Sequence, residues 1–143
     1  MAYTNSKYVH EVIKMAAEAK TRAEKIEVLR KYESWPLKDI LRGSFDDSIQ
    51  WLLPPGTPPY EPADPQRHPS SFIKQTQNLK YFAKGGPGEK INSLKRETMF
   101  IRMIEAIHPE DALLVLSMIN KKAPAKSITK KLVEEAFPNL IKK

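Results

Sequence analysis

Apolar residues recur along most of the chain every three or four positions, which is the spacing of a helix with one buried face. From residue 21 to 33 this face carries Ala23, Ile26 and Leu29. From 89 to 107 the same spacing holds for Ile91, Leu94, Ile101 and Ile104. We find no segment that alternates apolar and polar residues as a half-buried strand does. The pattern therefore predicts an all-α fold, a single-domain bundle of about six to eight helices.

Polar caps and prolines mark where the first helices begin and end. Thr21 and Glu24 have the spacing of a capping box, in which two side chains satisfy free backbone N–H groups of the first turn. Ser34 and Pro36 mark the end of that helix and the start of a shorter one. Gly43 is expected to end the shorter helix as its C-terminal cap.

A further helix is predicted directly after Gly43. Ser44 can cap its first turn, where Asp46 and Asp47 would lie at the positive end of the helix dipole. Its buried side would be formed by Ile49, Trp51, Leu52 and Leu53.

Glycine and proline separate the predicted helices of the second half. One helix runs from Ser70 or Ser71 to about Ala83, and the longest runs from about 89 to 107. Pro109 begins the next helix, and Pro124 breaks it. Ser127 then caps a last helix, whose apolar positions are Ile128, Leu132 and Ala136.

Seven of the 12 prolines fall between Pro54 and Pro69. Such a density excludes helix and sheet interior alike and predicts an extended, semi-rigid connection. We interpret residues 54–69 as a connecting segment within a single domain that spans 1–143.

Composition narrows the class of protein. Hydrophobic residues make up 41% of the chain and charged residues 29%, which is an ordinary globular balance. No run approaches 18 apolar residues, and the N-terminus has no apolar secretory core, so we expect no membrane partner and a cytoplasmic location, the host cytoplasm if the protein is viral. The absence of cysteine excludes disulfides, thiolate metal sites and cysteine nucleophiles.

Positive charge gathers at the C-terminal end. The net charge is +7, and residues 121–143 alone carry seven lysines against two glutamates. A solvated helix face can carry such charges with no ligand, but clustered lysines also suit an acidic partner.

Enzymatic signatures are missing from the sequence. The string from Gly85 to Lys90 reads G-G-P-G-E-K, but a phosphate-binding loop needs Gly-Lys-Ser/Thr after a strand. The histidines, His10, His68 and His108, have no metal-ligand spacing, and we expect surface roles or, for His108, a helix cap before Pro109. We therefore predict no catalytic residues, no metal site, no cofactor and no enzymatic activity.

The helix order and several local strings resemble the N-terminal DNA-binding domain of ATP-dependent DNA ligases, especially of the T-even bacteriophage type. The resemblance covers roughly residues 20–141 and is moderately specific. The segments that carry it are Lys25–Tyr32, Pro36–Arg42, Ser48–Leu52, Asp111–Asn120, Ile128–Val133 and Ala136–Ile141. The K-x-D-G adenylation motif of these ligases occurs nowhere in this sequence, so the resemblance implies a free-standing, non-catalytic relative of the domain.

In that family the domain grips the sugar-phosphate backbone of duplex DNA, including nicked DNA, with little sequence preference. The resemblance therefore implies a role in phage-like replication, repair or recombination. Lysines and the N-terminus of a helix are the groups that bind phosphates without reading bases. The candidate residues are Lys121, Lys122, Lys126, Ser127, Lys130 and Lys131, with Arg96 and Arg102 as weaker candidates.

A protein–protein adaptor that docks onto replication or transcription machinery is the alternative. Trp35, Phe45 and Trp51 could supply its aromatic anchors, although we expect core packing for at least two of them. An exposed apolar patch would favour the adaptor, and a continuous basic surface would favour DNA.

Overall fold

The computed structural model describes residues 8–67 and 72–141. Its α-helices are α1 (Val9–Glu18), α2 (Arg22–Lys31), α3 (Trp35–Phe45), α4 (Phe72–Gln75), α5 (Ser93–Ala106), α6 (Pro109–Ile119) and α7 (Lys130–Ala136). Three 3₁₀ helices, Pro65–Arg67, Thr76–Phe82 and Pro87–Lys90, complete the regular structure of these residues. Their only β-type pairing is one isolated antiparallel bridge between Trp51 and Ala83. The predicted all-α class is confirmed.

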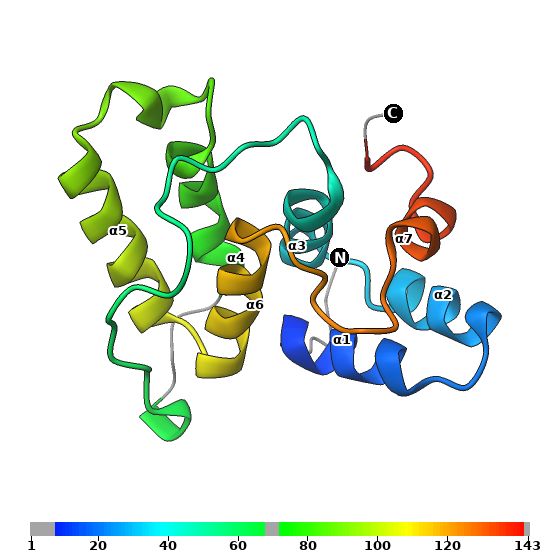
Figure 1. Ribbon diagram of the computed structural model, residues 1–143. Coiled ribbons are helices and arrows are strands. Elements are labelled where there is room, and N and C mark those ends of the chain that lie inside the picture. The colour runs from blue at the N-terminus through cyan, green and yellow to red at the C-terminus, as the bar shows by residue number, and fades with distance from the viewer. Residues whose placement is uncertain (1–7, 68–71, 142–143) are drawn as a thin grey trace.

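Helices α3 and α6 pack against each other in the middle of the molecule (Figure 1). On one side of them α1 packs on α2 and α6, and α2 packs on α7. On the other side lie α4, α5 and the 3₁₀ helix Thr76–Phe82 (Figure 1). Helices α5 and α7 therefore stand at opposite ends of the molecule.

One connected cluster of buried side chains runs through both sides. Helices from the two ends contribute to it, for example through Val12 of α1, Leu41 of α3, Phe100 of α5, Val115 of α6 and Val133 of α7. Because these side chains touch across the middle of the molecule, each end of the bundle supports the other.

Several predicted caps are confirmed, although the Thr21–Glu24 capping box is only half formed, since the Glu24 side chain accepts the Lys20 N–H and not that of Thr21. Thr21 Oγ1 accepts the Glu24 N–H at 3.1 Å and starts α2, and Ser34 Oγ accepts the Leu37 N–H at 3.3 Å and starts α3. His108 Nδ1 accepts the Glu110 N–H at 3.1 Å at the start of α6. These positions were recognisable because a polar residue stands directly before an apolar stripe.

The predicted end of α3 is wrong, since Gly43 lies inside the helix, which continues to Phe45. A Cβ at Gly43 would lie 2.5 Å from Met118 Sδ and 2.8 Å from Trp51 Cζ2. The residue is glycine because α6 and the Trp51 ring approach the backbone here, and not because the chain turns.

The prediction of a helix directly after Gly43, capped by Ser44, is also wrong. Ser44 is buried within α3, and residues 46–53 form turns and an extended stretch. Asp46 Oδ1 accepts hydrogen bonds from the backbone N–H and the hydroxyl of Ser48, at 2.9 and 2.6 Å. Such a local turn competes with helix formation. The chain beyond it pairs with the segment around Ala83 instead, through the Leu52 N–H to Phe82 O bond of 2.7 Å.

Two further helices differ from the prediction. The segment expected to be helical up to Ala83 divides into α4 and a 3₁₀ helix, and its expected start at Ser70 or Ser71 lies outside the described residues. Helix α5 begins at Ser93 instead of 89, so Ile91 precedes it and Leu94, 73% exposed, faces solvent. The buried stripe consists of Phe100, Met103, Ile104 and Ile107.

Residues 54–64 of the proline-rich connection contain no helix or strand, as expected, and the chain bends at Pro55 and Gly56. Residues 65–67 instead form a 3₁₀ helix, and 68–69 lie outside the described residues. The connection runs across the α4–α6 side of the molecule (Figure 1) and is held at two points. Gly56 exchanges two hydrogen bonds with the Asn120 side chain at the end of α6, and the Glu61 N–H donates to Glu105 Oε2 of α5 at 2.8 Å.

Candidate nucleic-acid interface

The connection between α6 and α7, residues 120–129, carries most of the lysines expected to contact phosphate. Helix α6 ends because Lys121 adopts a left-handed conformation with φ of 56°. The Lys121 N–H then donates to Met118 O at 3.0 Å and the Lys122 N–H to Ser117 O at 2.9 Å, which satisfies the last carbonyls of α6. This tight turn separates two consecutive lysines that then serve different purposes.

Lys121 is exposed overall, but its ammonium lies against the end of α3. Its Nζ donates to the carbonyl oxygens of Gly43 and Asp46, at 2.7 and 2.8 Å, at the C-terminal end of α3. Burial lowers the pKa of Lys121, while the nearby Asp47 and Asp46 act to raise it and Lys130 acts to lower it further. A cation at the negative end of a helix dipole stabilises the helix, so Lys121 is a structural cap of α3.

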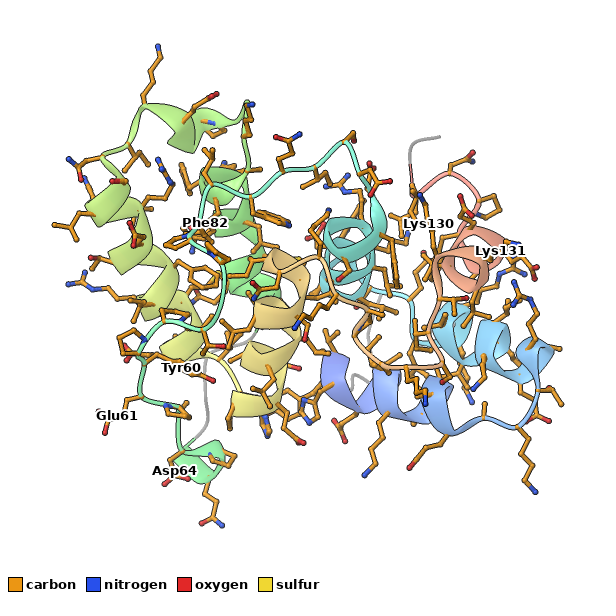
Figure 2. All side chains as sticks on the ribbon, viewed as in Figure 1. Tyr60, Glu61, Asp64, Phe82, Lys130 and Lys131 are labelled. Carbon is orange, nitrogen blue, oxygen red and sulfur yellow. The ribbon has the colours of Figure 1, made fainter. Side chains whose placement is uncertain are left out.

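The two lysines of the first turn of α7 are labelled in Figure 2. Lys130 Nζ lies 3.6 Å from Asp47 Oδ2, and the Asp47 side chain is 92% exposed. An ion pair this open to water is weak. Lys130 can therefore exchange Asp47 for another anion. Lys131 is exposed and, within the described residues, its ammonium has no hydrogen bond or ion pair.

Lys122 and Lys126 are exposed as well, and neither ammonium is bonded to any part of the protein that the structure describes. Together with Lys131 they leave three unpaired positive charges on the connection and the first turn of α7. The three lysines are close together in the sequence, between residues 122 and 131.

Ser127 has a different role from the one predicted. Its hydroxyl donates to Ala17 O of α1 at 3.1 Å and accepts a bond of 3.4 Å from Lys25 Nζ. The cap of α7 is Thr129, whose Oγ1 accepts the Leu132 N–H at 3.2 Å. Ser127 lies too early to cap because residues 125–128 still form a turn, closed by the Ile128 N–H to Ala125 O bond.

The two candidate arginines lie away from these lysines. Arg96 Nε donates to Leu52 O, and its Nη1 donates to Gly88 O and Ile91 O, so Arg96 fastens α5 to the loops beside it. Arg102 is exposed on the same helix. Because α5 and α7 stand at opposite ends of the molecule (Figure 1), the structure does not bring the arginines and the lysines together.

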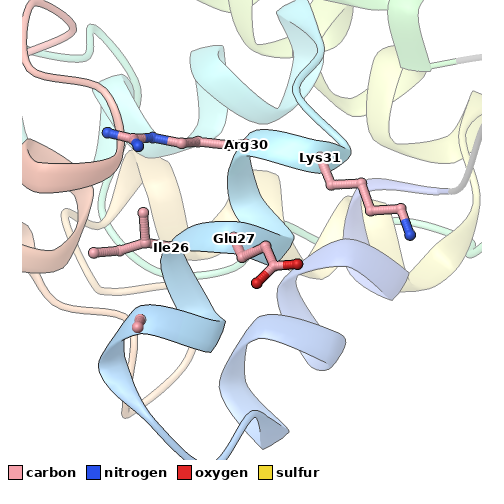
Figure 3. A pocket seen from close by; sticks show the side chains of 5 residues that line it. Ile26, Glu27, Arg30 and Lys31 are labelled. Carbon is pink, nitrogen blue, oxygen red and sulfur yellow. The ribbon is translucent and has the colours of Figure 1, made fainter.

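Two hollows lie on the surface of the described residues. One lies on α2 and is lined by Ala23, Ile26, Glu27, Arg30 and Lys31 (Figure 3). Arg30 is used there to join helices, since its guanidinium donates to Ala136 O at 3.0 Å and Glu135 O at 2.9 Å. The other is lined by residues of α4, the 3₁₀ helix Thr76–Phe82 and α5, among them Phe82 and Arg102.

The sequence reasoning missed a histidine cluster. His10 and His108 have no metal-ligand spacing in the sequence, but their rings stack with centroids 4.3 Å apart, and Tyr8 packs against both. Glu110 and Asp111 lie against His10. No sequence spacing could reveal this pairing, because α1 and α6 meet only in the folded chain. His68 lies outside the described residues.

None of the described helices is long and apolar enough to cross a membrane.

Comparison with known proteins gives one match. The profile of DUF6433, a family of unknown function, matches residues 12–124. That range extends from α1 through α6 and includes Lys121 and Lys122. No curated protein and no solved structure matches the chain.

Proposed function

This chain belongs to the DUF6433 family, and we propose that it is a non-catalytic protein that binds the sugar-phosphate backbone of duplex DNA. The contacts come from the connection between α6 and α7 and from the first turn of α7. The resemblance to the DNA-binding domain of phage-type ligases supports a role in replication, repair or recombination. The lack of a K-x-D-G motif supports binding without adenylation.

The observation that carries the proposal is the difference between paired and unpaired lysines. Within the described residues Lys121 is committed to the end of α3, whereas the ammonium groups of Lys122, Lys126 and Lys131 bond to nothing. Lys130 joins them by giving up its exposed ion pair with Asp47. Long, hydrated lysine side chains are suited to phosphates, which present charge without base information.

A salt titration of duplex binding tests the proposal. Three or four phosphate contacts give a slope of log affinity against log salt of about −2.7 to −3.6, because each contact releases about 0.9 of a counterion. Replacing Lys122, Lys126 and Lys131 with alanine should weaken binding to all sequences alike and flatten the slope by about 2.7 units.

A matched control variant removes three lysines from another part of the surface. Lys84, Lys90 and Lys95 are exposed on the α5 side, and their replacement with alanine should change the slope far less. Equal losses in the two triple variants would mean that only net charge matters. An unchanged affinity in the first variant would move the interface away from α7.

The adaptor is the second candidate, and Trp35 favours it. Trp35 is 67% exposed at the start of α3, whereas Trp51 and Phe45 pack against the core. Exposed tryptophan is a frequent anchor in protein interfaces. If the parent protein binds no duplex, nicked or single-stranded DNA even at low salt, the adaptor replaces the DNA-binding proposal. A replication or transcription protein would then be the partner to seek.

A further inference from the structure

Two histidines and two carboxylates meet where α1 and α6 begin. His10 lies in the first turn of α1, His108 is the cap of α6, and Glu110 and Asp111 lie in the first turn of α6. One ligand atom each from His10, His108 and Glu110 lies within 4.8 Å of the other two. The fold thus brings together donors from segments about a hundred residues apart along the chain.

Asp111 orients the His10 ring. The Asp111 side chain is 1% exposed, and its Oδ1 lies 2.9 Å from His10 Nδ1 while it also accepts the His10 backbone N–H at 3.0 Å. A buried carboxylate fixes the proton on Nδ1 and leaves the lone pair on Nε2. This is the arrangement in which an outer carboxylate orients a metal-binding histidine.

The free side of His10 faces Glu110. His10 Nε2 lies 3.2 Å from Glu110 Oε2. With Nδ1 donating to Asp111, a neutral His10 ring presents an acceptor to the Glu110 carboxylate, so this contact is attractive only when a proton or a metal ion lies between the two atoms. Two ligands of a tetrahedral zinc ion stand about 3.3 Å apart, given bond lengths near 2.0 Å. The observed separation fits that of two such ligands.

We propose that His10, His108 and Glu110 bind a divalent transition-metal ion of the zinc class, with Asp111 as the outer partner of His10. Two imidazole nitrogens and one carboxylate oxygen suit zinc, nickel or cobalt, whereas magnesium prefers oxygen ligands alone. Three protein ligands leave the fourth position of the ion to water.

His108 contributes at a cost. Its Nδ1 accepts the Glu110 N–H at 3.1 Å, so the neutral ring carries its proton on Nε2. Binding the ion through Nδ1 exchanges this helix-cap hydrogen bond for a metal bond. The Glu110 N–H loses its acceptor in this exchange, so the amide resonance of Glu110 reports on the site.

The ion joins α1 to α6. Its ligands come from both helices, so the bound metal stabilises the packed state and not the unfolded chain. This inference is independent of DNA binding, since the cluster shares no residue with the connection between α6 and α7 or with the first turn of α7.

Calorimetric titration of the full chain with zinc chloride tests the site. We expect one ion per chain, a thermal midpoint that rises with zinc, and no response to magnesium. His108→Gln and Glu110→Gln should each weaken zinc binding about tenfold or more, as loss of a metal-site group does. Glu110 has a 65% exposed side chain, so Glu110→Gln keeps the fold even where a histidine variant does not.

Glu27→Gln is the matched control for Glu110→Gln, because Glu27 is exposed on α2, outside the cluster, and its replacement should leave zinc binding unchanged. In the parent protein the Glu110 amide resonance should shift on zinc addition. Failure of the parent chain to bind zinc or nickel would overturn the proposal. So would zinc binding of parental strength in both His108→Gln and Glu110→Gln.

Discussion

At Lys121 the backbone takes a left-handed turn that points the ammonium back at the last carbonyls of α3. One residue later, Lys122 faces solvent. The sequence Lys121-Lys122 presents two equivalent charges, and only the tertiary contact with Gly43 and Asp46 separates their roles. Caps formed within one turn, such as Thr21 and His108, were predictable from sequence because both partners are near neighbours.

Replacing Lys121 with methionine should therefore lower the free energy of unfolding by about 1–2 kcal/mol, since it removes two charge-assisted hydrogen bonds that are partly open to water. Lys122→Met should leave stability within about 0.5 kcal/mol of the parent, as exposed sites do. Urea unfolding of the two variants checks this difference. Equal stabilities would contradict the structural role of Lys121.

Gly43 illustrates what a sequence pattern cannot show. A glycine near the end of an apolar stripe resembles a helix cap, but here the reason for it lies on another helix, at Met118. Local rules therefore predicted caps whose two partners lie within one turn, and they failed where a loop such as 46–53 found its hydrogen bonds far along the chain.

Gly43→Ala should destabilise the protein by about 1–3 kcal/mol, the usual cost of overpacking, although alanine inside an exposed helix normally stabilises it by up to about 1 kcal/mol. Thermal or urea unfolding shows whether Gly43→Ala lowers or raises the free energy of unfolding. Met118→Ala should relieve part of the cost in the double variant, because Met118 Sδ is the nearest atom to the added methyl. If the two substitutions change stability additively, the added methyl group is not strained against Met118.

Helix α2 is tied to α7 by Arg22, which donates to Glu135 Oε1 from Nε and Nη2 at 3.1 and 2.8 Å. The hydrogen bond from Arg22 lowers the pKa of Glu135 below its ordinary value of 4.5. A lowered carboxyl pKa means that the stabilisation is present above pH 4.5 and is lost as the pH falls through the folded value.

Arg22→Met should raise the pKa of Glu135 back toward 4.5, measured by an NMR titration of the side-chain carboxyl carbon. The pair is exposed, so we expect little change in stability at neutral pH. A Glu135 pKa that is unchanged by the substitution would show that the ion pair does not form in solution.

At the scale of the whole molecule, one connected core links the α5 end to the α7 end. The sequence predicted the helical class and the lack of helix and strand over residues 54–64. It could not predict which helices pack together, because α2 meets α7, and α1 meets α6, through residues far apart along the chain. The same reason hid the histidine cluster.

A shared core predicts that the chain unfolds as one unit. Denaturation followed by far-ultraviolet circular dichroism and by tryptophan fluorescence should give coincident transitions. Trp51 serves as the core reporter, since it packs against α3 and donates from Nε1 to Gly43 O at 3.3 Å. Two separate transitions would contradict the single domain predicted for residues 1–143.

The contact of α2 with α7 has a consequence for how the protein is made. Arg22 and Glu135 are 113 residues apart, and Arg30 reaches Ala136 across 106. A ribosome releases α2 long before it releases the helix that covers it. Throughout that interval the nascent chain exposes the apolar face around Leu29 and Ile26, which is open to chaperones and to other chains. The contact forms only after α7 has been synthesised and docks onto α2.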